Sequence, residues 1–260
     1  MPLALLTLAL SAVAAPHARP AKSDAIYDVV VVAGIGARRI EGQTALSARR
    51  QGGGVWTLQT VRTNNTWDDA AEHLSYDSDA PQPGAPWPLI TQHAVASVPV
   101  DVVFDRSGRP ERLVSEDEWR QQATTALEAL DLPDAGVRSG EALVDPQGLL
   151  ADLGRTFVGT PNSEWTRTDR LTGVDVERRE TCETSKQAGI TTWTCTGDAV
   201  AVTQDDGQLQ DAETWTTVRA DRRGLLDIEE GWSGTLVHLT PDGQTVTDSP
   251  IGGRRLVRRR

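Results

Sequence analysis

The chain has 260 residues and a formal net charge of −11, from 37 acidic and 26 basic side chains. A surface of that charge repels nucleic-acid phosphates at long range, so no nucleic-acid partner is expected. The sequence contains no CxxC, no HExxH and no two of its four histidines at metal-ligand spacing. It therefore predicts neither a zinc site nor a cofactor.

The first 15 residues form an uncharged apolar stretch that ends in small residues, as signal peptidase requires. Residues 1–15 are therefore interpreted as a signal peptide, and the mature protein is expected to be periplasmic or extracellular. No Lys or Arg precedes Leu3, as one normally does in an export signal, and a short buried N-terminal helix is the alternative. No later apolar run approaches the ~18 residues of a membrane helix, so no transmembrane segment is expected.

A strand is predicted at residues 26–33. The segment 34–39 after it is similar to the opening of a dinucleotide-binding loop, in which glycines let the backbone approach a pyrophosphate. Arg39 replaces the third glycine, and residues 40–48 alternate as a strand does. We therefore favour a glycine-loosened strand or bulge over a nucleotide site.

Residues 40–63 predict a hairpin closed by the glycine-rich turn at 51–54. The pattern then dissolves into Asn, Asp, Pro and Gly, which predicts a loop over residues 64–93. Asp77 and Asp79 in this loop could hold calcium, but no third spaced acid is visible, and a calcium site is not favoured. A strand is expected at 94–104.

Two helices are predicted next. Ser115 and Glu118 have the spacing of a capping box, and an apolar stripe follows, which gives a helix at 115–131. Asp145 and Pro146 resemble a cap followed by proline in the first turn, which gives a second helix at 146–158.

The last part of the chain, 164–257, has short Thr-, Val- and Trp-rich runs separated by turns, as in an antiparallel meander. Folding the hairpin about the turn at 186–189 places Cys182 opposite Cys195, so these two are predicted to form a disulfide. Strand alternation would put Glu230 and His238 on the apolar face, where a desolvated carboxylate could act as acid or base. We favour a bulge at Gly231 that turns Glu230 outward.

Five of the last seven residues are arginines. They are interpreted as the solvated end of the last strand, with charge that discourages edge pairing, although a phosphate-binding tail is conceivable. No serine lies in a GxSxG motif, so a serine hydrolase is not favoured.

The order of strands, a strand–turn–strand leading into two helices (VVFDRSGRPERLVSEDEWRQQATTALEAL), and then long strands resembles bacterial periplasmic half-barrels of the lipoprotein-carrier type, the LolA-like and LppX-like proteins. The resemblance rests on element order, and no binding residue is carried over from it. It implies a curved sheet that wraps around inserted helices and shelters a lipid or acyl chain. A closed lipocalin-like barrel would not have two helices in its middle.

We therefore expect a mainly β (α+β) protein: a curved antiparallel sheet or half-barrel of roughly eight to eleven strands with two inserted helices. It should form one domain over residues 24–258, with two domains cut near residue 135 as the rival. The expected function is a non-catalytic cell-envelope protein that binds a lipid or other apolar ligand, or another envelope protein. The residues expected to line or anchor the site are Trp56, Trp165, Trp215 and Trp232. A structural or protein-interaction module with a solid core is the alternative, and a hydrolase is less favoured.

Overall fold

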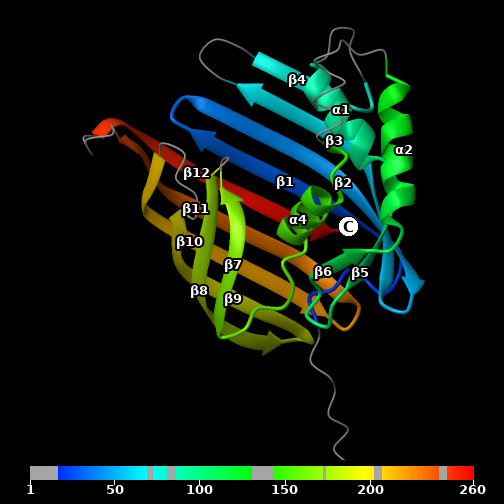
Figure 1. Ribbon diagram of the computed structural model, residues 1–260. Coiled ribbons are helices and arrows are strands. Elements are labelled where there is room, and N and C mark those ends of the chain that lie inside the picture. Colours follow the sequence, from blue (N-terminus) through cyan, green and yellow to red (C-terminus); the bar gives the residue numbers. More distant parts are fainter. Residues whose placement is uncertain are drawn as a thin grey trace, which may run out of the picture.

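The computed structural model describes residues 17–68, 73–80, 86–130, 143–171, 174–201, 207–239 and 245–260 (Figure 1). The expected signal peptide at 1–15 and the rival domain boundary near 135 lie outside these residues. No helix in the described ranges is long and apolar enough to cross a membrane.

One antiparallel sheet of twelve strands organises the molecule. Its order is β6-β5-β3-β2-β1-β12-β11-β10-β9-β8-β7, with β4 paired to the far end of β3. The strands are β1 Ala25–Ile35, β2 Arg38–Gly52, β3 Val55–Asp68, β4 His73–Asp77, β5 Val100–Phe104, β6 Pro110–Leu113, β7 Glu164–Leu171, β8 Val174–Gln187, β9 Ile190–Ala201, β10 Gly207–Asp221, β11 Gly224–Leu239 and β12 Thr245–Arg259. This confirms the predicted fold class, with one strand more than the expected range.

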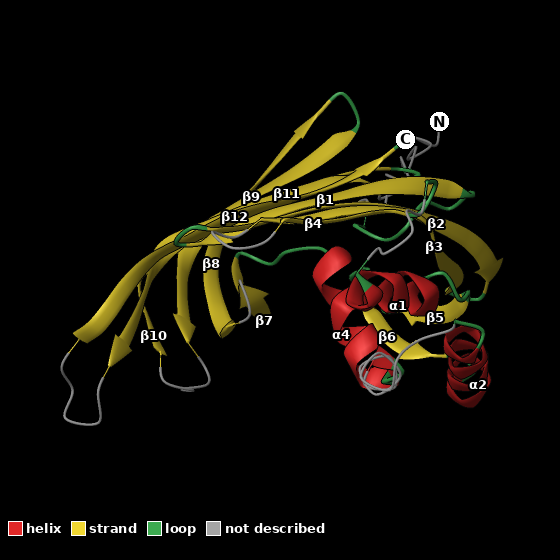
Figure 2. Cartoon of the chain, turned by 90° about the horizontal axis from the view of Figure 1, so that it is seen from above, coloured by secondary structure: helices red, strands yellow, loops and turns green. Residues whose placement is uncertain are grey.

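Within the described residues, the sheet curves around three helices that all lie on one side of it (Figure 2). They are α1 Trp87–Ala96, α2 Glu116–Glu128 and α4 Pro146–Thr156. We call the side of the sheet that faces the helices the inner face. Both ends of the sheet bend toward the helices, so the architecture is an open half-barrel with helices in its concavity.

The first hairpin is longer and tighter than predicted. β1 pairs with β2 along the whole length of β1, from Ala25 opposite Ala48 to Ile35 opposite Arg38. Gly36 has φ +56° in the turn between them, a backbone conformation that glycine adopts without strain. The glycines at 34–36 therefore serve a hairpin turn, and no helix follows them as in a dinucleotide-binding fold.

The prediction of a loop at 64–93 is wrong. β3 continues to Asp68, β4 pairs with it, and α1 occupies residues 87–96, where a loop and then a strand were expected. α1 was missed because Pro88 lies in its first turn, where a helix tolerates proline, and because its sequence is apolar with little amphipathic pattern.

The two predicted helices are confirmed, each ending two or three residues earlier than expected. Asp145 caps α4, because its carboxylate accepts hydrogen bonds from the backbone N–H of Gln147 (3.1 Å) and Gly148 (2.9 Å). Ser115 occupies the corresponding position of α2, but its side chain makes no capping hydrogen bond, so the capping box is not formed.

The interpretation of the C-terminal arginines as an edge is wrong. β12 lies between β1 and β11 in the middle of the sheet, where both of its edges are paired. Four of the five C-terminal arginines are paired with acids on β1, β10 and β11. The pairs are Arg254 with Glu229, Arg255 with Glu230, Arg259 with Asp221 and Arg260 with Asp28.

The segment of residues 18–22 packs against turns from distant parts of the chain. Ala18 and Ala21 are buried, and the indole N–H of Trp56 donates to the carbonyl of Ala21 (2.9 Å). The carbonyl of Arg19 accepts from the backbone N–H of Leu225 (2.6 Å). This N-terminal strap therefore joins β3 to the β10–β11 turn.

The predicted disulfide between Cys182 and Cys195 is confirmed. The two residues are direct cross-strand partners on β8 and β9, and both are buried in the main core. The bond closes a 13-residue separation in the sequence and restricts the unfolded chain.

We expect the variant with both Cys182→Ala and Cys195→Ala to lose about 3 kcal/mol of unfolding free energy, because its unfolded chain is no longer constrained. Urea titration at neutral pH measures the loss. Dithiothreitol should lower the midpoint of the wild type and leave the double variant unchanged. A double variant as stable as the oxidised wild type would contradict the expectation.

Candidate ligand site

The inner face of β1, β2 and β3 forms the floor of two neighbouring pockets. One pocket, of about 340 Å³, lies between this floor, α1 and α4. The other, of about 400 Å³, lies beside α1 and extends toward the end of β3. Val29, Thr44 and Gln92 line both pockets, so the two are contiguous.

Strand alternation builds this floor. Val29 and Val31 of β1 point inward, and Val29 pairs with Thr44 of β2. Both valines are half-buried, although β1 lies in the middle of the sheet. Helices that packed closely over them would bury them fully, so apolar surface on the inner face remains accessible.

The floor is more exposed at the end where β2 begins and β3 ends. Ile40 and Trp67 are cross-strand partners on β2 and β3 that line the larger pocket, and they are 40% and 39% exposed. Leu89 of α1 closes the pocket from the other side. Large apolar side chains left uncovered around a concavity are the usual form of a site for an apolar ligand.

The inner face of β7, β8, β11 and β12 is different, because it carries a buried network of charges. The network has three arginines and three carboxylates: Arg167, Arg178, Arg255, Asp169, Glu180 and Glu230. Its formal charges sum to zero. Arg255 also donates to the backbone carbonyl of Arg155 in α4 (3.1 Å), which attaches that helix to the sheet.

Glu230 is at the centre of this network, and the expectation that a bulge turns it outward is wrong. Its carboxylate is fully buried on the inner face and is paired with Arg167, Arg178 (3.0 Å) and Arg255. Burial alone would raise the pKa of Glu230, but the three guanidinium groups outweigh it and lower the pKa to about 2. The side chain is therefore a permanent anion at neutral pH and a poor general acid or base. His238 pairs through its backbone with Thr247, and its side chain lies outside the described part of the structure.

The four tryptophans named from the sequence do not gather at one site. Trp56 belongs to the main core, and Trp165 packs there against Arg167 (4.8 Å from the guanidinium carbon to the ring centroid). Trp232 is buried in a second, smaller cluster on the inner face. Trp215 lies on the opposite face of the sheet, 38% exposed, over Gly231.

None of these four lines the two contiguous pockets, whereas Trp67 does. Trp67 was overlooked because its segment was assigned to a loop. The alternation of Thr63, Asn65 and Trp67 on β3 was a usable signal, but polar residues dominate it.

Asp77 and Asp79, once considered for calcium, lie near Arg62. The Nε atom of Arg62 is 2.9 Å from Asp79, and its Nη2 atom is 3.7 Å from Asp77. Within the described residues, no three acids, histidines or cysteines gather as a metal site would require.

The fold defines a class: an open, strongly curved antiparallel sheet that shelters helices on its inner face. Among solved structures, the chain is similar to one of lipovitellin that concerns lipid–protein interactions, with 10% identity and a TM-score of 0.50. The match covers 91% of this chain and 25% of the other, so this chain spans about a quarter of the length of that protein. The likeness is one of fold.

A second similarity is to a domain assigned to an outer membrane lipoprotein-sorting protein of Vibrio parahaemolyticus, with 9% identity over 93% of this chain and 87% of the other. Its TM-score of 0.20 does not establish a shared fold. No family model and no curated protein sequence matches the chain.

We expect Glu230→Gln to lower the unfolding free energy by about 3–5 kcal/mol, because it leaves buried arginines without their counter-charge. Glu229→Gln is the matched control, since Glu229 is the neighbouring residue and its partner Arg254 is exposed. That exposed pair should contribute no more than about 1 kcal/mol. Urea titrations of both variants at pH 7 make the comparison.

The same network gives a pH dependence. The pKa of Glu230 is depressed in the folded state, so its ionisation stabilises the fold above its ordinary pKa of 4.5, and this stability is lost as the pH falls toward 2. The wild type should therefore lose more stability than Glu230→Gln between pH 5 and pH 2. If the wild type and Glu230→Gln lost the same unfolding free energy between pH 5 and pH 2, the role of Glu230 would be refuted.

Proposed function

We propose that the protein binds an apolar ligand, a lipid or acyl chain, between α1, α4 and the inner face of β1–β3. The observation that carries this proposal is the pair of contiguous pockets of about 340 and 400 Å³ over half-buried apolar side chains. Each has the volume of an ordinary small-molecule site. A flexible chain could occupy both, because they share part of their lining.

The proposed protein is a carrier or binding module rather than an enzyme. Glu230 was the strongest candidate for a general acid or base, but its carboxylate is paired with three arginines in a network that stabilises the fold. The pockets also favour ligand binding over the alternative of a solid core used for protein contacts. Trp56, Trp165 and Trp232 anchor the inner face in this proposal, while Trp67 contacts the ligand.

We also propose an exported location for the protein. The disulfide supports it, because such bonds persist in oxidising compartments. The apolar segment 1–15 would direct the export. All twelve strands belong to one sheet, which supports one domain over residues 24–258.

Thr44→Phe should weaken binding of a fatty acid or phospholipid by at least about tenfold, because the ring fills space that both pockets share. Gln43→Phe is the matched control: it adds the same ring to the neighbouring residue, which is exposed and points away from the pockets. Titration with a fluorescent fatty acid compares the two variants with the wild type. Equal affinity in all three would contradict the proposed site.

Trp67 provides a direct reporter. Emission of the wild type should shift to shorter wavelength on addition of ligand, because the indole loses contact with water, and Trp67→Phe should lack this shift while still binding. Mass spectrometry of an organic extract should find lipid in protein purified from its native envelope. Absence of both signals would leave the interaction module as the better reading.

A further inference from the structure

The two contiguous pockets of the candidate site meet at a group of uncharged polar side chains. The hydroxyl-bearing Thr44 of β2 and the amide-bearing Gln92 of α1 line both pockets, so they lie where the pockets join. Asn65 of β3 lines the larger pocket together with these two. We call the side chains of Thr44, Asn65 and Gln92 the polar waist of the site.

Gly42 makes room for the amide of Asn65. The two residues are cross-strand partners on β2 and β3, and both line the larger pocket. A Cβ atom at position 42 would lie 2.9 Å from the Oδ1 atom of Asn65, which is closer than real Cβ contacts come. The amide therefore lies over the glycine on the inner face, where strand alternation also places Thr44.

The polar waist has hydrogen-bonding capacity that the protein does not use. Within the described residues, the side chains of Thr44, Asn65 and Gln92 make no hydrogen bond. The neighbouring Asn64, in contrast, donates to the carboxylate of Asp77 (3.5 Å). A purely apolar chain that displaced water from the waist would leave two amides and a hydroxyl without partners, which is unfavourable. A ligand that fits this site therefore has a polar group at the same position.

The lining offers no positive charge to an acidic headgroup. Among the described residues, the charged side chains that line the two pockets are Asp145 and Asp152, and no lysine or arginine does so. Asp145 caps α4, and Asp152 is paired with Arg155. A carboxylate or phosphate in these pockets would lose hydration without gaining a cation. The polar group of the ligand is therefore uncharged.

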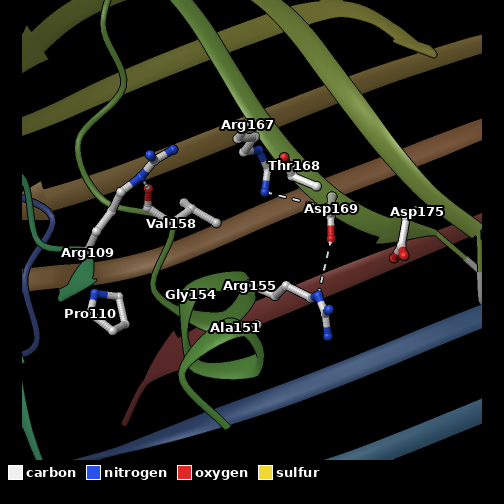
Figure 3. A pocket seen from close by; sticks show the side chains of 10 residues that line it. All are labelled: Arg109, Pro110, Ala151, Gly154, Arg155, Val158, Arg167, Thr168, Asp169 and Asp175. Atoms are coloured by element: carbon white, nitrogen blue, oxygen red, sulfur yellow. Dashed lines mark hydrogen bonds and ion pairs between the residues drawn. The ribbon is translucent and has the colours of Figure 1, made fainter. Parts of the chain in front are cut away.

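The arginines near α4 face another side of that helix. Figure 3 shows Arg109, Arg155 and Arg167 around a third pocket, of about 280 Å³, between β6, α4 and β7. The residues of α4 that line it differ from those that line the apolar site. Arg155 and Arg167 lie 4.0 and 3.6 Å from the carboxylate of Asp169. These arginines do not reach the two contiguous pockets.

We propose that the two contiguous pockets take a neutral lipid with an ester or amide carbonyl between two apolar arms. The carbonyl oxygen accepts hydrogen bonds at the polar waist, because amide N–H and hydroxyl O–H groups are donors. One arm lies in the smaller pocket against Leu149, and the other lies in the larger pocket against Trp67. A free fatty acid enters the same pockets with lower affinity. This inference rests on the proposed function and specifies the ligand class of that site.

Three ligands with the same number of carbon atoms test the proposal: hexyl octanoate, the free acid tetradecanoate and hexyl octyl ether. Competition with the neutral dye Nile red at pH 7 measures their affinities. Hexyl octanoate should bind at least about tenfold more tightly than tetradecanoate, because burial of the carboxylate without a cation is unfavourable. It should bind about fivefold more tightly than the ether, which lacks the carbonyl oxygen.

Asn65→Leu nearly preserves the size of the side chain and removes its amide. This variant should bind hexyl octanoate about three- to fivefold more weakly than the wild type does, and it should bind the ether no more weakly. Asn64→Leu is the matched control, because Asn64 is the neighbouring asparagine and does not line the pockets. It should keep the full preference for the ester.

The outcomes separate this inference from the proposed function. Tetradecanoate bound by the wild type as tightly as hexyl octanoate would overturn the neutral ligand class and leave the apolar site in place. Equal effects of Asn65→Leu on the ester and the ether, or an equal effect of Asn64→Leu on the ester, would overturn the carbonyl contact at the polar waist. If none of the three ligands displaces the dye from the wild type, the proposed function fails, and the ligand class fails with it.

Discussion

The central constraint in the described part of this structure is that twelve curved strands present more inner face than the three helices α1, α2 and α4 cover. α1 and α4 lie over the first half of the sheet, and the second half must be filled from its own side chains. The structure meets this need in three ways. Part of the face forms an apolar core, part is occupied by the buried arginine–carboxylate network, and part stays open as pockets.

Burying the charged network costs hydration free energy, and the network is stable only when all six side chains are present. Each of its ions gives up hydration, and the attraction between them compensates only when every charge has partners. The six residues come from β7, β8, β11 and β12, so the network also fixes how these strands are registered and curved.

The sequence was sufficient for the features that depend on local pattern. The hairpin at 51–54, the cap at Asp145 and the cross-strand cysteines all follow from residues close together in the chain, and all three are present. Two further errors concern long-range partners. Glu230 is stable on the inner face because Arg167, Arg178 and Arg255 compensate its charge there. These partners come from other strands, so the spacing of residues in the sequence does not reveal them.

The position of β12 was misjudged for the same reason. A strand rich in arginine resembles a solvated edge until the acids of β11, β10 and β1 are known to lie beside it. The candidate site shows the limit most clearly. Its floor is built from Val29, Thr44 and Trp67, which are ordinary strand residues whose importance comes only from the incomplete cover above them.

The pairing of β1 with β12 bears on how the chain is made. Val29 has its partner Val257 more than two hundred residues downstream, and the strap at 18–22 needs the turn near Leu225. When only the first half of the chain has been synthesised, β1 has no β12 to pair with. The sheet therefore cannot be completed at that stage. Final folding must therefore wait until the last strand of the polypeptide has been made.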